Sequence, residues 1–142
     1  MNAMKTLFLG GAAVSLVASS ASDPEITCGN DAAEISCDNG VCEINTDSFT
    51  PMGISIAGER SELCAYSACY KGRVVTEYRV AEHSFFDLEL RQFDPLQEVV
   101  VGEPVRVGVI HRPDSRSALV SFTGFAQVMS CDAPGDTDPR EG

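Results

Sequence analysis

Positive charge is scarce in this chain of 142 residues, which has 10 Lys and Arg residues against 21 Asp and Glu residues and a formal net charge of −11. A field of that sign repels the phosphates of DNA and RNA and the anionic surface of membranes. We therefore expect no nucleic-acid partner. Solubility alone is the simplest explanation of the acidity, and a cationic protein or an envelope component is the partner class that it favours.

Sequence signatures of cofactor and metal chemistry are also missing. The chain has no GxGxxG or P-loop motif, no EF-hand loop and no C-x-x-C pair. The two histidines, His83 and His111, have no second histidine at i+2 or i+4, where a zinc-binding pair would place it. We expect no cofactor, no metal and no enzymatic activity.

Three groups of residues have side chains that could take part in catalysis. Residues 53–57 (GISIA) resemble half of a nucleophile elbow around Ser55, but an elbow needs a strand-to-helix turn and these flanks alternate like strands. Asp87 and Glu89 lie on one strand face, where a solvated acidic surface is the simpler interpretation. His111 ends a valine-rich strand and is expected to be a partly buried strand-end histidine.

Long apolar runs are absent apart from residues 7–18, which follow Lys5 and precede a run of small residues up to Ser22. This order is typical of a secretory signal peptide, and the run is shorter than the roughly 20 apolar residues that span a bilayer. We interpret residues 1–22 as a signal peptide. The chain is then periplasmic or secreted, with no membrane span after cleavage.

The rest of the chain fits one domain. Residues 23–131 have a common domain size and contain no boundary signal or internal repeat. Residues 132–142 (DAPGDTDPREG) consist of Pro, Gly and acidic residues without an apolar anchor. We therefore predict a single all-β domain over 23–131 and a disordered acidic tail over 132–142.

All six cysteines follow the predicted signal peptide, and an even number in an exported chain predicts disulfides. Asn-Gly between Cys37 and Cys42 favours a two-residue hairpin that brings these cysteines opposite each other. Cys64 and Cys69 have the same spacing and are paired by analogy. Cys28 and Cys131 remain and would tie the first strand to the last. A zinc site built from the two C-x4-C pairs is the alternative.

Apolar and polar residues alternate with a period of two in the second half of the chain, which predicts half-buried strands. Within 73–80 we expect Val74, Tyr78 and Val80 to share one face. A turn is expected at 102–104, and residues 62–70 could hold one helical turn. The prediction is an all-β fold, a small antiparallel sandwich or barrel of about eight short strands stapled by disulfides.

One basic and aromatic cluster contrasts with the acidic whole. It consists of Tyr66, Tyr70, Lys71 and Arg73. Because tyrosine-rich loops often form protein interfaces, we regard this cluster as a candidate binding surface. An ordinary strand edge with packed tyrosines is the simpler interpretation.

Export, disulfides, acidity and the lack of a catalytic constellation together favour a non-enzymatic binding or inhibitor module of unknown ligand. In gross form the chain resembles bacterial lysozyme inhibitors, which are small, exported, mostly β and disulfide-bonded. The resemblance is one of architecture and rests on no shared motif. It implies a basic lysozyme as partner, steered by charge. The alternatives are an envelope structural or interaction protein that binds through a sheet edge or the tyrosine cluster, and an enzyme of unknown class.

Overall fold

The structure, a computed structural model, describes residues 25–30, 32–122 and 124–133. The predicted signal peptide and most of the predicted acidic tail lie outside the described residues. The described part of the chain is all-β, as predicted. It contains no helix with the length and apolar character that crossing a membrane requires.

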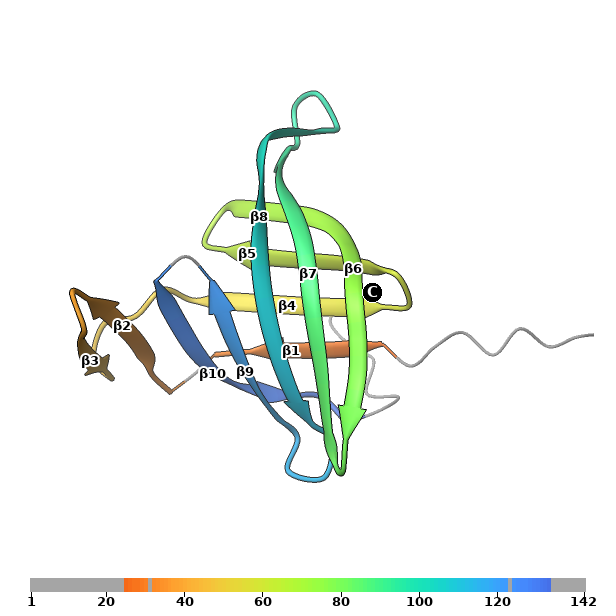
Figure 1. Cartoon of the computed structure of the whole chain (residues 1–142). Helices are drawn as coiled ribbons and strands as arrows, with labels where there is room; N and C mark the ends of the chain where they lie inside the picture. Colours follow the sequence, from red (N-terminus) through yellow and green to blue (C-terminus); the bar gives the residue numbers. More distant parts are fainter. Residues whose placement is uncertain (1–24, 31, 123, 134–142) are drawn as a thin grey trace, which may run out of the picture.

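Ten antiparallel strands form one sheet (Figure 1). They are β1 (Ile26–Gly29), β2 (Glu34–Asp38), β3 (Val41–Asn45), β4 (Met52–Ala57), β5 (Arg60–Ala65), β6 (Ala68–Val80), β7 (His83–Asp94), β8 (Val99–Arg112), β9 (Ser117–Phe122) and β10 (Phe125–Cys131). Eight of them pair in the order β1-β4-β5-β6-β7-β8-β9-β10, and a β1–β10 pairing closes this circuit into a barrel. Of the two predicted architectures, a sandwich and a barrel, the chain adopts the barrel.

The β2–β3 hairpin lies outside the closed circuit. The first residues of β10, Phe125–Gln127, pair with β2, whereas its last residues, Ser130 and Cys131, pair with β1. One strand thus serves both the barrel and the hairpin. In Figure 1 the hairpin stands to one side of the barrel. We call this end of the barrel the hairpin end, and the opposite end, where the chain enters at Glu25 and leaves at Asp132, the entry end.

The barrel interior is filled by apolar side chains. An eight-stranded barrel has an interior just wide enough for its own side chains, and here leucines, valines, isoleucines and methionines occupy it. The core consists of Cys28, Met52, Ile54, Ile56, Leu63, Phe86, Leu88, Leu90, Val107, Val109, Ala118, Val120, Met129 and Cys131. The alternation predicted for the second half of the chain is confirmed in β7, β8 and β9.

The sequence-based prediction was wrong for residues 62–70. They form no helical turn but the end of β5, a turn and the start of β6. Ser61 and Leu63 point into the core while Glu62 faces outward toward Lys71. This short strand has only one strongly apolar inward residue, Leu63, and its pattern is therefore weak when the sequence is read alone.

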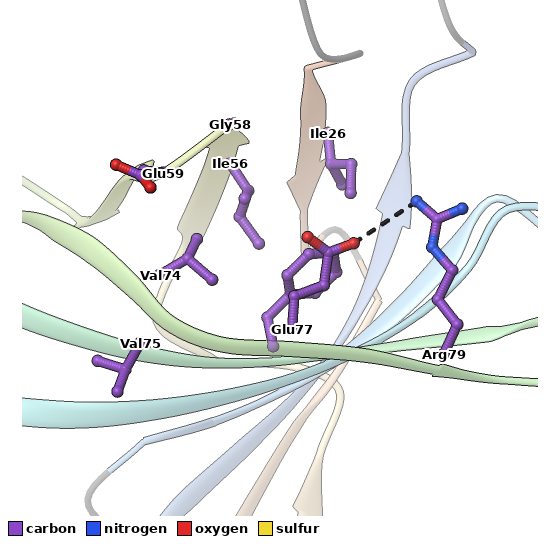
Figure 2. A pocket seen from close by; sticks show the side chains of 9 residues that line it. Ile26, Ile56, Gly58, Glu59, Val74, Val75, Glu77 and Arg79 are labelled. Atoms are coloured by element: carbon purple, nitrogen blue, oxygen red, sulfur yellow. Dashed lines mark ion pairs between the residues drawn. The ribbon is translucent and has the colours of Figure 1, made fainter.

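A β-bulge at Val75 reverses the faces of β6. Val74 packs against the core, but Tyr78 and Val80 are exposed, so the predicted common face of these residues is wrong. Beyond the bulge, Glu77 and Arg79 turn toward the barrel end (Figure 2). An extra residue in one strand shifts the two-residue period by one, and no local signal in the sequence marks it.

The turn predicted at 102–104 is not formed. These residues lie instead at a second irregularity, in the pairing of β7 with β8. β8 runs unbroken through Gly102, and the register with β7 shifts between Leu90 and Gln92. The positive φ of 76° at Gly102 explains why glycine stands there. What looked like the boundary between two strands is therefore a bend within one long strand.

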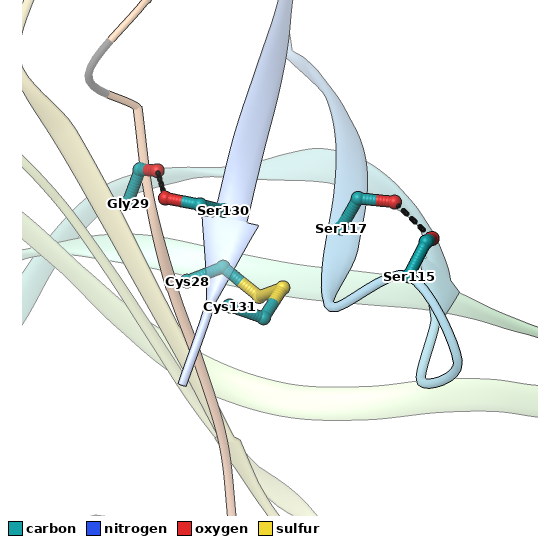
Figure 3. Close-up of a disulfide and its surroundings, with 6 residues drawn as sticks. All are labelled: Cys28, Gly29, Ser115, Ser117, Ser130 and Cys131. Carbon is teal, nitrogen blue, oxygen red and sulfur yellow. Dashed lines mark hydrogen bonds between the residues drawn. A yellow bond between two sulfur atoms is a disulfide. The ribbon is translucent and has the colours of Figure 1, made fainter. Parts of the chain in front are cut away.

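The three disulfides join the predicted pairs, which confirms that part of the sequence analysis. Asn39 and Gly40 both have positive φ, as the predicted two-residue turn between Cys37 and Cys42 requires. Cys28 and Cys131 lie opposite each other in β1 and β10, where the barrel closes (Figure 3). Three disulfides in a small domain are consistent with an oxidising, exported location.

Candidate functional site

The predicted tyrosine and basic cluster is divided between two sides of the sheet. Tyr66 occupies the exposed turn between β5 and β6. Tyr70 faces inward and packs against Phe122, with 5.7 Å between the ring centroids. Of the two tyrosines in the predicted cluster, Tyr66 therefore offers an exposed aromatic surface and Tyr70 does not.

The basic members of that cluster face outward and are already paired. The Lys71 ammonium lies 3.5 Å from a carboxylate oxygen of Glu62 and 4.0 Å from the centroid of the Phe93 ring. The Arg73 guanidinium lies 3.2 Å from a carboxylate oxygen of Glu89. The structure thus brings these side chains next to acids, and it does not gather the four predicted residues into one patch.

The catalytic candidates are also separated. Ser55 lies in the middle of β4, which continues as a strand to Ala57, so the strand-to-helix turn of a nucleophile elbow is not formed. Asp87 accepts hydrogen bonds from Arg106, and Glu89 lies within ion-pairing distance of the same guanidinium. The acid pair is part of a surface ion-pair network.

One cluster has the composition of a metal site, and its chemistry excludes that role. Carboxylate and sulfur atoms of Glu62, Cys64 and Cys69 lie within 4.8 Å of one another. The two sulfur atoms form a disulfide and therefore cannot act as thiolate ligands. The other described residues contain no comparable group of potential ligands.

The strongest candidate site for a protein partner is the β2–β3 hairpin. Every residue of β3 is exposed, and Val41 and Ile44 are 67% and 72% exposed. A groove of about 500 Å³ lies between the hairpin and the β9–β10 turn, lined by Asp38, Val41, Glu43 and Phe125 among others. Apolar side chains flanked by acids are thus presented along an open surface.

Charge is distributed unevenly between this hairpin and the rest of the molecule. From Asp23 to Glu59 the chain contains no Lys or Arg, whereas all basic residues of the described part lie between Arg60 and Arg116. Asp38, Glu43 and Asp47 are exposed on the hairpin and the loop after it. The net negative charge is therefore concentrated on the part of the molecule that protrudes.

A polar network fixes the base of the hairpin to the barrel. The Gln127 side chain is 1% exposed, donates from Nε2 to Glu34 over 2.9 Å and accepts from Asn30 over 2.6 Å. Glu34 also accepts from the backbone N–H of Thr50 over 3.0 Å. That backbone bond, assisted by the Gln127 amide, holds the pKa of Glu34 below its usual range despite partial burial.

Two cavities open at the entry end. The larger, about 350 Å³, lies between β1, the β4–β5 turn and the part of β6 beyond the bulge. Figure 2 shows Glu77 and Arg79 reaching over it from β6, with 3.5 Å between their charged groups. The smaller, about 240 Å³, adjoins it through Ile26 and Arg79 and contains His111.

Comparison with family models, with curated proteins and with solved structures finds no match to this chain. Function must therefore be inferred from the molecule itself. Sequence reasoning missed the hairpin as a site, although the absence of Lys and Arg before Arg60 was visible in the sequence. It could not find Gln127, because only folding brings it to Glu34, which is 93 residues away.

Proposed function

We propose that this protein is an exported, non-enzymatic module that binds a basic protein of the lysozyme type through its β2–β3 hairpin. The observation that carries the proposal is the placement of acidic charge without any basic residue on a protruding, stapled hairpin. Opposite charges speed the encounter of two proteins and select against wrong partners. A basic partner fits this surface, while nucleic acids and anionic membranes do not.

Apolar side chains supply the affinity that charge alone does not. Interface energy is usually concentrated in a few buried apolar or aromatic anchors within a polar rim. Val41 and Phe125 line the groove beside Asp38 and Glu43, so anchors and acids lie on the same surface. Contact with a basic partner would bury the apolar pair and leave the acids at the rim.

The hairpin is also held rigid before a partner arrives. The Cys37–Cys42 bond closes its tip, and the Gln127–Glu34 network fixes its base. A rigid binding element loses less conformational entropy when the complex forms. This favours binding by a preformed surface.

The proposed location is the periplasm or the extracellular medium. The predicted signal peptide at residues 1–22 and the disulfides support it, because structural disulfides persist in oxidising compartments.

The test measures binding of the oxidised chain to a c-type lysozyme by calorimetry, together with lysis of bacterial cells. The variant Asp38→Asn/Glu43→Gln removes two hairpin charges without changing side-chain size. Its matched control, Glu98→Gln/Glu103→Gln, removes two exposed charges from the β7–β8 region. We expect the hairpin variant to bind about tenfold more weakly or worse, and the control to lose little, because close interfacial charges contribute well over 1 kcal/mol.

Several outcomes would contradict the proposal. These are the absence of binding with unchanged lysis, equal losses in the two variants, or equal affinity for cytochrome c, another basic protein. The last result would identify a non-selective acidic surface.

A second candidate function is supported by the free edge of β3. In the described sheet β3 pairs with β2 alone, and an exposed strand edge can accept a strand from another chain. An envelope protein bound in this way would depend on backbone contacts. Binding of such a protein that is unaffected by Asp38→Asn/Glu43→Gln would favour this alternative.

A further inference from the structure

The last inward-facing rung of the barrel at the entry end is polar. Arg79 of β6 lies opposite Ser84 of β7, and Ser84 lies opposite His111 of β8. Ser84 and His111 are only 6% and 9% exposed. The next rung toward the core has Glu77 of β6 opposite Phe86 of β7, and Phe86 opposite Val109 of β8, so on β7 and β8 the interior changes from apolar to polar within one rung.

This rung opens onto the smaller cavity. The cavity holds about 240 Å³ and is lined by Glu25, Ile26, Arg79, Ser84, His111, Pro113, Arg116 and Asp132. A water molecule has a share of liquid volume near 30 Å³, so the space corresponds to roughly eight waters. Its size suits a small organic molecule.

His111 lacks a hydrogen-bond partner that its environment requires. Its Nδ1 atom is buried and has no partner among the described residues, whereas buried polar atoms are almost always hydrogen-bonded. Burial, and then the charge of Arg79, lower the pKa of His111. The imidazole is therefore neutral near pH 7 and offers one donor and one acceptor.

The charged groups at the cavity indicate the sign of its ligand. Arg79 and Arg116 are among the residues that line it, and guanidinium groups match carboxylates in geometry. Arg79 also forms an ion pair with Glu77, with 3.5 Å between the charged groups. Among the described residues, none of the ion pairs formed involves Arg116. Glu25 and Asp132 line the same cavity and repel any anion, a dianion such as phosphate more strongly than a monoanion. Among anions, a ligand with a single negative charge therefore fits this cavity best.

We propose that this cavity binds the carboxylate of a small monoanionic organic acid, with Ser84 and His111 as hydrogen-bonding groups and Arg79 and Arg116 as counter-charges. Ile26 and Pro113 provide an apolar wall for the body of the ligand. The free carboxyl terminus of a peptide has the same chemistry. The site is independent of the hairpin, which lies at the opposite end of the barrel.

The test uses NMR of the histidine side chains in the oxidised protein. The chain has only two histidines, so His83→Gln assigns the signals of His111. Butyrate is titrated against its neutral match, butyramide, and a tripeptide with a free carboxyl terminus against its amidated form. We expect saturable shifts of the His111 signals with the carboxylates alone, and a higher pKa of His111 in the complex because the bound anion stabilises the imidazolium.

Variants of two cavity residues test whether their side chains bind the carboxylate. Ser84→Ala and Arg116→Gln should weaken carboxylate binding about tenfold, the usual effect of losing a hydrogen bond to a charged group. Arg91→Gln, an exposed arginine elsewhere on β7, is the matched control and should change nothing. The source that binds more tightly, free acid or peptide terminus, identifies the ligand type. The proposal is overturned if neither carboxylate produces saturation up to roughly 10 mM, or if butyramide binds equally well.

Discussion

The barrel and the β2–β3 hairpin are stabilised in different ways. The barrel buries leucines, valines and isoleucines from eight strands, and its charged residues of both signs pair on the outer surface. The hairpin buries almost nothing of its own, and β3 is exposed along its whole length. The backbone pairing of β2 with Phe125–Gln127 of β10, one disulfide and the hydrogen bonds of Glu34 hold it in place.

This difference separates stability from recognition. An isolated two-stranded hairpin is marginally stable in water, so β2–β3 depends on the barrel for its structure. The barrel, in contrast, closes through the β1–β10 pairing without the hairpin. Residues of the hairpin are therefore free to serve a partner, since few of them are needed for the fold.

The largest expected effect concerns the disulfides of the two regions. Cys28–Cys131 closes a loop of 103 residues, and Cys37–Cys42 one of only 5. In the chain-entropy model, loss of the long bridge costs about 4–5 kcal/mol and loss of the short one about 2 kcal/mol. Denaturant unfolding of Cys28→Ala/Cys131→Ala and Cys37→Ala/Cys42→Ala measures both. Equal losses would show that the hairpin contributes to stability as much as the barrel closure does.

An intermediate effect is expected where the two regions meet. Gln127→Leu removes the donor to Glu34 and the acceptor for Asn30, and unsatisfied buried partners cost about 1–3 kcal/mol. Faster hydrogen exchange should follow in β2 and β3 but not in β7. Gln92→Leu, at an exposed position of β7, is the control and should leave exchange unchanged. Uniformly faster exchange in the variant would mean that hairpin and barrel unfold as one unit.

The smallest expected effects concern the pH dependence of stability. The titrating group of the barrel, His111, and that of the hairpin base, Glu34, act in different pH ranges. The pKa of His111 in the barrel is lowered by burial and by Arg79. The stability that the neutral imidazole contributes is therefore fully present above the unfolded pKa of about 6.5. It is lost as the pH falls through the lower pKa of the folded state. The pKa of Glu34 at the hairpin base is also lowered, so its contribution is lost only as pH falls below about 4.3.

Unfolding free energies measured from pH 8 to pH 3 check this order. His111→Gln should remove the decline that begins near pH 6.5, while His83→Gln, on the outer face, should keep it. Glu34→Gln should flatten only the acidic end of the profile. A decline near pH 6.5 that persists in His111→Gln would contradict the assignment.

Much of this fold could be predicted because its signals are local. Alternation in β7 to β9 places the core residues of those strands, and Asn39-Gly40 identifies a hairpin turn from two adjacent residues. Pairing Cys28 with Cys131 followed from the two shorter pairs. The candidate site was less accessible, since the predicted cluster at Tyr66 to Arg73 followed sequence proximity, and alternation sends Tyr70 and Lys71 to opposite faces.

The sequence by itself determined the all-β class, the acidity, the cysteine pairs and the face of most inward residues, because each depends on composition or on a period of two. Only the tertiary structure decided that the sheet closes into a barrel and that β2–β3 stays outside it. It also decided that the bulge at Val75 turns Arg79 toward Ser84 and His111. These features depend on register between distant strands, and one inserted residue reverses a whole face without leaving a mark on the local pattern.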